Sequence, residues 1–190
     1  MLNTNISTDK KPALFLDRDG TLIEDVGYMK SSNLIKWLPK VQDRLKMFVE
    51  NKYLLVVITN QSGIGRGLLE EKDVTSIHSK MNEQMLDLYG IVISKFYYCP
   101  HHPEAIISKY RKNCLCRKPG KLLFNKAIRE LNINTKNSIC IGDKLTDLTA
   151  ANAAGIKKLF LLNQIPTKIR PVASFQYTTI KSWDEFQSQL

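Results

Sequence analysis

Five short apolar runs, separated by amphipathic stretches, constrain the fold of this chain more than any other feature of its sequence. The runs span residues 13–16, 54–58, 92–98, 138–141 and 158–162. Each run is rich in Val, Ile, Leu or Phe, which is typical of strands that are buried on both faces. Strands that alternate with helices predict an α/β fold of the Rossmann-like, doubly wound kind, in which helices cover both faces of a parallel sheet.

The amphipathic stretches predict four helices, over residues 39–49, 74–88, 122–131 and 145–154. Pro39 suits the first helical position, because a residue there needs no intrahelical N–H bond. In each stretch the apolar residues recur at steps of three and four, so they share one face of the helix. Gly155 is placed to cap the last of these helices.

The polar segment over residues 1–11 lacks the apolar region of a secretory signal, so we expect a flexible tail and a cytoplasmic protein. No run reaches the roughly 18 apolar residues that cross a bilayer, which argues against a membrane partner. The remaining residues, 12–190, suffice for a single domain with a sizeable core.

The chain carries 28 basic and 18 acidic residues, a formal net charge of +10. Such a balance suits an anionic partner, either a nucleic acid or a phosphorylated metabolite, although it also serves solubility. The basic residues are scattered rather than gathered into one block, which argues against nucleic acid. A small phosphorylated molecule is therefore the expected partner.

Two carboxylates, Asp17 and Asp19, stand where the first apolar run ends. In an extended chain they would face the same side, with backbones about 6–7 Å apart. This spacing lets one carboxylate attack a phosphorus atom while the other exchanges a proton with the leaving oxygen. Gly20 would allow the sharp turn that exposes both. A turn or a helix cap is the alternative explanation of this motif on its own.

Three further polar motifs follow along the chain. Residues 59–63 offer hydroxyl, amide and backbone donors to phosphate oxygens. Lys118 supplies a cation that can neutralise a transferring phosphoryl group. Asp143 and Asp147 provide the hard oxygen ligands that Mg²⁺ prefers. Taken singly, these motifs could also be a polar turn, an exposed basic pair and a helix N-cap. In a parallel sheet, however, strand ends of this kind meet at one edge and share a ligand site.

Cysteine and histidine side chains cluster between residues 99 and 116. Cys99, Cys114 and Cys116 supply three thiolates, and His101 or His102 supplies an imidazole. A Cys₃His set of this kind forms a closed, tetrahedral zinc site that is structural rather than catalytic. Buried or redox-active thiols are the alternative.

The four phosphoryl-transfer motifs, in this order, resemble those of the haloacid-dehalogenase-like (HAD) phosphatase superfamily over roughly residues 13–162. The resemblance implies that Asp17 forms an aspartyl-phosphate and that Asp19 acts as general acid and then as general base. Thr59 and Lys118 would hold the phosphoryl group. The implied Mg²⁺ ligands are Asp17, the backbone carbonyl of Asp19, and Asp143.

A narrower resemblance comes from the combination of DRDGT, TNQSG, CPHHP, CxCRKP and GDK. Together these motifs resemble the D-glycero-D-manno-heptose 1,7-bisphosphate 7-phosphatases, a family that serves nucleotide-activated heptose biosynthesis for lipopolysaccharide and surface glycans. The resemblance implies an HAD fold with a small zinc loop over residues 99–116 and no large cap domain. The implied zinc ligands are Cys99, His101, Cys114 and Cys116. The implied substrate-binding residues are Asp25, Val26, Gly27, Tyr28, Asn60, Gln61, Ser62, Arg117 and Lys144, and Arg117 would recognise the phosphate that is not cleaved.

Histidinol-phosphate phosphatases are the main alternative family, because they share these motifs and the zinc loop. The long segment between Cys99 and Cys114, and Ser62 in place of an acidic residue, favour the heptose family. In one departure from that family, Gly120 follows Pro119 directly, where two further residues are usual. This shortening could reshape the pocket near the phosphoryl group.

Two other functions share part of this pattern. A polynucleotide 3′-phosphatase would share the Asp-x-Asp motif, but it has no evident use for the zinc loop. A zinc-stabilised nucleic-acid-binding module without activity would not need the complete catalytic set that this chain carries. We therefore expect a Mg²⁺-dependent phosphatase with a structural Zn²⁺, which acts as a monomer on a small phosphorylated sugar.

Overall fold

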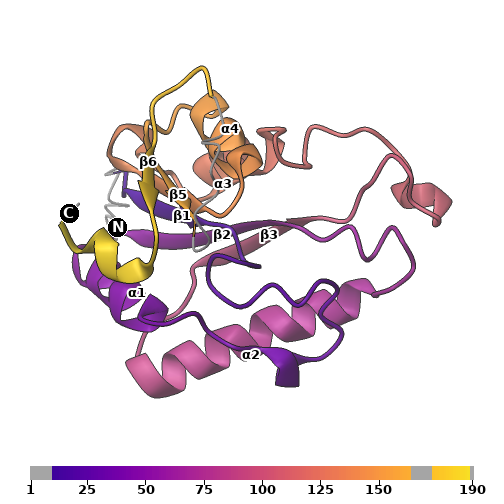
Figure 1. Ribbon diagram of the computed structural model, residues 1–190, viewed down its shortest axis with the longest axis horizontal. Helices are drawn as coiled ribbons and strands as arrows, with labels where there is room; N and C mark the ends of the chain where they lie inside the picture. Colours follow the sequence, from indigo (N-terminus) through magenta and orange to yellow (C-terminus); the bar gives the residue numbers. More distant parts are fainter. Residues whose placement is uncertain (1–9, 164–172, 189–190) are drawn as a thin grey trace, which may run out of the picture.

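A six-stranded parallel sheet forms the centre of the computed structural model, which describes residues 10–163 and 173–188 (Figure 1). The strand order is β3-β2-β1-β4-β5-β6, and every neighbouring pair is parallel. The strands are β1 (Ala13–Leu16), β2 (Leu54–Asn60), β3 (Lys95–Cys99), β4 (Ile139–Gly142), β5 (Lys158–Leu162) and β6 (Thr178–Ile180). The predicted doubly wound parallel sheet is confirmed, and β6 is a strand that the sequence pattern did not indicate.

Helices cover both faces of the sheet, as predicted (Figure 1). Helices α1 (Val41–Glu50) and α2 (Glu71–Tyr89) lie on one face, and α3 (Leu122–Glu130) and α4 (Leu145–Ala153) lie on the other. Short 3₁₀ helices span Ser32–Leu34, Ser108–Tyr110, Thr135–Asn137 and Trp183–Ser188. Within the described ranges no large cap domain accompanies this layered core, in agreement with the expected fold.

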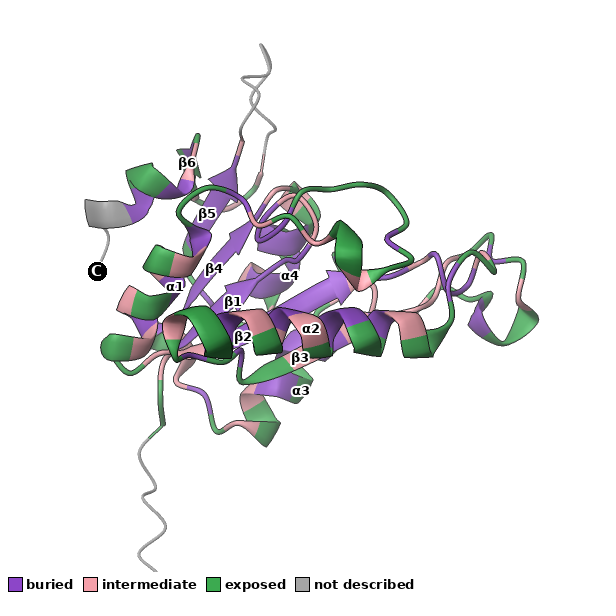
Figure 2. Ribbon diagram, turned by 90° about the horizontal axis from the view of Figure 1, so that it is seen from below, coloured by how far each residue is buried: buried purple, intermediate pink, exposed green. Residues whose placement is uncertain are grey.

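The strands divide their side chains between two hydrophobic cores, because alternate residues of a strand face opposite sides of the sheet. Leu14 and Leu16 of β1 pack toward α1 and α2, whereas Ala13 and Phe15 pack toward α3 and α4. Both β1 and β4 are buried along their whole length, as the unbroken purple of these strands in Figure 2 shows. Burial on both faces explains why these runs are uniformly apolar rather than alternating.

Several element boundaries differ from those predicted, and two of the differences have a clear structural cause. Helix α1 begins at Val41 rather than Pro39, because Lys40 has a left-handed backbone conformation with φ of 66°. The last apolar residues before β3 do not join the strand that was predicted to begin at residue 92. Instead, the Asn82 side chain of α2 accepts a 2.8 Å hydrogen bond from the Ile93 N–H and donates to its carbonyl at 3.2 Å.

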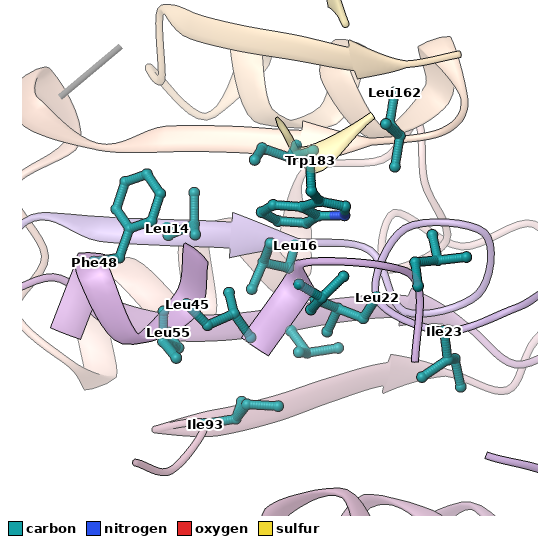
Figure 3. Packing of buried hydrophobic residues seen from close by; sticks show 14 of the residues in the cluster. Leu14, Leu16, Leu22, Ile23, Leu45, Phe48, Leu55, Ile93, Leu162 and Trp183 are labelled. Carbon is teal, nitrogen blue, oxygen red and sulfur yellow. The ribbon is translucent and has the colours of Figure 1, made fainter. Parts of the chain in front are cut away.

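The C-terminal segment closes one of the two cores. Trp183 is 1% exposed and lies over Leu16 and Leu22 (Figure 3). Its indole N–H donates a 2.8 Å hydrogen bond to the backbone carbonyl of Thr21, in the loop that follows β1. Trp183 thus helps to hold the loop that carries Asp17 and Asp19.

Of the expected flexible tail, residues 1–9 lie outside the described residues. Lys11 forms a parallel backbone bridge with Ile133, and its carbonyl accepts a hydrogen bond from the Asn134 N–H at 2.8 Å. Among the described helices, none is both long enough and apolar enough to cross a membrane.

Candidate active site

A cavity of about 430 Å³ opens at the carboxyl ends of the central strands. It lies beside β1, where the chain order reverses between β2 and β4, which is the usual ligand position in such sheets. Twelve of the predicted site residues line it: Asp17, Asp19, Asp25, Gly27, Tyr28, Thr59, Asn60, Gln61, Ser62, Arg117, Lys118 and Lys144. Gly63, Thr146 and Asp147 also line it. Gly63 and Asp147 belong to the polar motifs that the sequence indicated, whereas Thr146 was not named there.

Asp17 and Lys118 form the buried floor of this cavity. The Asp17 N–H donates a 3.1 Å hydrogen bond to the Ile141 carbonyl of β4, so the sheet ladder fixes its backbone. The Lys118 ammonium donates to Asp17 Oδ1 at 2.5 Å and to the Ile58 carbonyl at 2.7 Å. It also lies 2.7 Å from Asp147 Oδ1. Burial disfavours the lysine charge, but the Asp147 and Asp17 carboxylates outweigh burial and raise the pKa of Lys118. The ammonium therefore remains charged beside the candidate nucleophile.

Three carboxylates, those of Asp17, Asp143 and Asp147, place ligand oxygens within 4.8 Å of one another. Burial raises the pKa of Asp143 to about 7, and the charges of Asp17 and Asp147 add to this effect. Asp143 Oδ1 is buried and has no hydrogen-bond partner within residues 10–163 and 173–188. A divalent cation would satisfy this oxygen and relieve the repulsion, so the donor set fits Mg²⁺.

The turn at Gly20 makes room for this acidic cluster. Gly20 has φ of +80°, a conformation that side-chain-bearing residues rarely adopt. A Cβ atom there would lie 2.7 Å from Asp143 Oδ2. The glycine that follows Asp19 is thus required both by the backbone and by the approach of a candidate metal ligand. The backbone carbonyl of Asp19 as a third ligand stays a prediction.

The Asp19 carboxylate is held from two sides. Arg18 donates to its Oδ1 at 3.1 Å and lies 3.0 Å from its Oδ2, and Gln61 donates to Oδ2 at 2.8 Å. Burial raises the pKa of Asp19; the Arg18 charge opposes this effect and the Asp17 charge adds to it. A carboxyl group with a raised pKa is suited to donate a proton.

The end of β2 carries donors in two different arrangements. The Gln61 amide also donates a 2.9 Å hydrogen bond to the Thr59 hydroxyl, which is almost completely buried. The Asn60 amide instead holds the backbone of Lys118: it accepts from the N–H at 3.0 Å and donates to the carbonyl at 3.2 Å. Asn60 therefore positions the lysine, and its contact with substrate stays a prediction.

The predicted substrate loop over residues 25–28 forms the exposed rim of the cavity. Its turn is held by a 2.9 Å hydrogen bond from the Gly27 N–H to Asp25 Oδ1. Lys144 lies 3.6 Å from Asp25 Oδ2 and 3.3 Å from Asp143 Oδ2, so it links the rim to the acidic cluster. Val26 is 45% exposed and is not among the described lining residues.

The predicted zinc ligands converge on one point beyond the strand ends. The thiol sulfurs lie 3.0–3.5 Å apart, and His101 Nδ1 lies 3.1 Å from the Cys116 sulfur and 3.6 Å from that of Cys99. A tetrahedral site with Zn–S bonds of about 2.3 Å has sulfurs about 3.8 Å apart, so the donor set fits zinc with small adjustments. His102 is directed elsewhere, with Nε2 3.2 Å from an Arg66 guanidinium nitrogen.

Arg117 connects the zinc loop to the cavity, and Gly120 packs against that loop. Arg117 directly follows Cys116 and lines the cavity, and its Nη1 is buried without a hydrogen-bond partner in the described part of the chain. Gly120 donates a 2.7 Å hydrogen bond to the Arg117 carbonyl, and a Cβ atom on it would clash with the Leu115 carbonyl. The shortened segment after Pro119 thus packs against the zinc loop, and Gly120 is not among the described residues that line the cavity.

Comparison with known proteins identifies the family of this chain. A family model described as HAD-hydrolase-like matches residues 115–169. The D-glycero-beta-D-manno-heptose-1,7-bisphosphate 7-phosphatase of Haemophilus ducreyi is 43% identical over 152 residues, which cover 80% of this chain and 83% of the relative. The protein of the same name from Vibrio cholerae is 41% identical over 146 residues, which cover 77% of this chain and 78% of the relative.

The fold of this chain also matches that of a solved structure. D,D-heptose 1,7-bisphosphate phosphatase from B. bronchiseptica, complexed with magnesium and phosphate, matches with a TM-score of 0.70 and 30% sequence identity, over 80% of each chain. The fold and the site define an HAD-like phosphatase, a phosphoric monoester hydrolase. More narrowly, the chain belongs to the family of heptose-bisphosphate 7-phosphatases that these relatives represent.

Proposed function

We propose that this chain hydrolyses the 7-phosphate of D-glycero-D-manno-heptose 1,7-bisphosphate, in the synthesis of nucleotide-activated heptose for lipopolysaccharide or surface glycans. One observation carries the proposal: Asp17 and Arg117 line the same cavity of about 430 Å³. A nucleophile beside a buried ammonium suits the reacting phosphate. A guanidinium at the zinc loop suits a second phosphate, because its planar fork binds phosphate oxygens in pairs.

The reaction begins when an Asp17 carboxylate oxygen attacks the phosphorus atom. The bond between phosphorus and the sugar oxygen breaks, and that oxygen takes the proton of Asp19, so the sugar leaves as an alcohol and Asp17 carries an acyl-phosphate. Asp19, now a carboxylate, takes a proton from a water whose oxygen attacks the phosphorus. The bond to the Asp17 oxygen breaks, which releases inorganic phosphate and restores both carboxyl groups. Thr59 and Lys118 hold the phosphoryl oxygens throughout.

Two metal ions belong to the proposal. Asp17, Asp143 and the backbone carbonyl of Asp19 would hold Mg²⁺, which supplies positive charge to the phosphoryl oxygens. Zn²⁺ at the four-residue Cys and His cluster would be structural, since all four positions of a tetrahedral site are filled by protein atoms. The thiols must be reduced to bind zinc, which fits the expected cytoplasmic location.

The second phosphate distinguishes the proposed substrate from monophosphates. A histidinol-phosphate phosphatase, or another small-molecule phosphatase, would use the same catalytic residues but would not need a cation for a second phosphate. Arg117 supports the bisphosphate, because its buried Nη1 has no hydrogen-bond partner among the residues that the structure describes. We propose that the enzyme works as a monomer, without nucleic-acid or membrane partners.

A phosphate-release screen tests the substrate class directly. It compares both anomers of heptose 1,7-bisphosphate, histidinol phosphate, fructose 1,6-bisphosphate and a 3′-phosphorylated oligonucleotide. We expect the highest kcat/KM for one heptose 1,7-bisphosphate anomer, with no release by Asp17→Asn, whose amide cannot form the acyl-phosphate. A higher kcat/KM for histidinol phosphate or for the oligonucleotide would overturn the substrate assignment. Turnover by Asp17→Asn within a hundredfold of wild type would overturn the nucleophile, because this is a loss of less than about 2.7 kcal/mol in transition-state stabilisation.

A further inference from the structure

Arg18 lies between the two catalytic carboxylates in the sequence, yet its side chain is only 1% exposed. Burying a guanidinium costs free energy unless its N–H groups find hydrogen-bond partners. Its Nε donates to Asp19 Oδ1 at 3.1 Å, and one terminal nitrogen lies 3.0 Å from Asp19 Oδ2. The guanidinium therefore binds both oxygens of the Asp19 carboxylate, which fixes the plane of that group as well as its position.

His78 of α2 completes this arrangement from outside the cavity. The remaining terminal nitrogen of Arg18 lies 3.3 Å from His78 Nε2. The imidazole stacks on Phe96 of β3, with ring centroids 4.3 Å apart and planes inclined by 12°. Burial and the Arg18 charge lower the pKa of His78 to about 3, so the ring is neutral and Nε2 can accept the Arg18 N–H.

We propose that Arg18, oriented by His78, is a positioning residue that aims the Asp19 carboxyl group at the leaving oxygen of the substrate. This inference rests on the proposed acid role of Asp19. Gln61, which directly follows β2, also donates to Asp19 Oδ2 at 2.8 Å, so the carboxyl group is held both by the guanidinium and by this loop. The chain of contacts runs from Phe96 through His78 and Arg18 to Asp19.

The proposal has a signature that a purely structural role would lack. A sugar alkoxide is strongly basic and leaves well only when Asp19 protonates it, whereas p-nitrophenolate is weakly basic and leaves without this help. Misplacing Asp19 should therefore slow a sugar phosphate far more than p-nitrophenyl phosphate. kcat/KM is the right quantity, because it reports the steps up to release of the leaving group and does not include hydrolysis of the acyl-phosphate.

Two variants of His78 separate the hydrogen bond from the ring stack. His78→Phe keeps an aromatic ring against Phe96 but removes the acceptor for Arg18, whereas His78→Gln keeps an acceptor without the ring. We expect His78→Phe to lower kcat/KM for heptose 1,7-bisphosphate about 10-fold and that for p-nitrophenyl phosphate less than 2-fold. His78→Gln should recover most of the loss. These values are a fraction of the roughly 10²–10⁴-fold that a general acid contributes.

Three further variants complete the experiment. Arg18→Gln should show the same selective loss, at about 100-fold on the sugar phosphate, below the limit for losing the acid itself. Asp19→Asn is the reference. It should show the largest difference between the loss of kcat/KM on the sugar phosphate and the loss on p-nitrophenyl phosphate. Gln84→Ala is the matched control on α2, because it removes a 2.7 Å hydrogen bond to Trp37 that does not reach the cavity. The ratio of the two kcat/KM values should stay at the wild-type level in Gln84→Ala.

Equal losses on both substrates in His78→Phe and Arg18→Gln would show that the two residues serve only the fold, and would overturn the proposal. Wild-type kcat/KM on the sugar phosphate in His78→Phe would do the same. If Asp19→Asn itself shows no selectivity, the acid role in the proposed function fails. If only Asp19→Asn is selective, that role stands and the positioning by Arg18 and His78 is wrong.

Discussion

The Lys118 ammonium and the Asp147 carboxylate form an ion pair 2.7 Å long, in which both side chains are less than 5% exposed. Asp147 Oδ2 also accepts a 3.0 Å hydrogen bond from the Lys144 N–H, so one carboxylate caps α4 and neutralises the site lysine. Without Asp147 the buried ammonium would keep Asp17 but lose one of its two carboxylate partners, so the pair couples the stability of the fold to the site.

Asp147→Asn should therefore lower both the stability of the fold and the catalytic activity. We expect the free energy of unfolding, measured by urea denaturation, to fall by about 3 kcal/mol, the range for a broken buried pair. kcat/KM should fall at least tenfold, since Lys118 is then drawn more strongly to Asp17. The control is Asp43→Asn, which breaks an exposed 3.7 Å pair with Lys40 and should cost less than about 1 kcal/mol. Wild-type stability in Asp147→Asn would show that the pair contributes nothing.

Zinc and magnesium should respond differently to a chelator. Mild EDTA should remove activity, and added Mg²⁺ should restore it, whereas zinc should stay near one equivalent per chain by elemental analysis. Cys114→Ser should lose this zinc and unfold at a lower temperature. Cys140→Ala alters a buried thiol in β4, outside the cluster, and should retain the metal. A wild-type protein without zinc, together with unchanged stability in Cys114→Ser, would contradict the structural role of the metal.

Arg117→Ala should lower kcat/KM for a bisphosphate more than for a monophosphate. For heptose 1,7-bisphosphate we expect kcat/KM to fall about 10–100-fold, the loss of one charge-assisted hydrogen bond of roughly 1.5–3 kcal/mol. For p-nitrophenyl phosphate the change should be only a few-fold. Arg111→Ala is the control within the zinc loop, because Arg111 donates to the Ala105 carbonyl at 2.6 Å rather than lining the cavity. Equal losses on both substrates in Arg117→Ala would assign the arginine to the reacting phosphate or to the fold.

His78 should make stability depend on pH. Its pKa is lowered to about 3 in the folded chain by burial and the Arg18 charge, against about 6.5 when unfolded. Above the unfolded pKa both states are neutral, so stability is fully present there. As pH falls below it, only the unfolded chain takes up the proton. The free energy of unfolding should then drop by about 1–2 kcal/mol between pH 7 and pH 5.

His78→Phe provides the comparison for this pH dependence. Because phenylalanine does not titrate, the difference in unfolding free energy between wild type and variant should shrink as pH falls. Urea denaturation at pH 7, 6 and 5 measures it, and subtraction of the two series removes titrations that both proteins share. A difference that stays constant over this range would show that His78 becomes protonated in the folded chain.

The convergence of the site could be predicted from sequence because each motif is local and each follows a strand. Asp17 and Thr59 come directly from the ends of neighbouring strands, so a parallel sheet brings them together whatever the loops do. The same holds for the four zinc ligands, whose close spacing indicates a single site. Short apolar runs likewise indicate buried strands without knowledge of their order.

Contacts between distant segments could not be predicted in this way. Asn60 looks like a phosphate ligand in its motif, but its amide holds the Lys118 backbone, which depends on how two loops pack. His78 falls among apolar residues of α2 at helical spacing and looks like core. Asp147 has the weak signal of a second acidic residue one helical turn after Asp143, which also fits an ordinary cap. Strand β6 has too few residues to show a period.

The strand order carries one consequence for how this enzyme is made. Asp17, the candidate nucleophile, directly follows the central strand β1, but its partners come from later parts of the chain, up to Asp147 beyond β4. Chains are synthesised from the N-terminus, and a domain generally folds as a unit. A growing polypeptide therefore holds Asp17 long before it holds Lys118 or Asp143. We therefore expect phosphatase activity only after the whole domain has been synthesised and has folded. An incomplete polypeptide should not hydrolyse the phosphate esters around it.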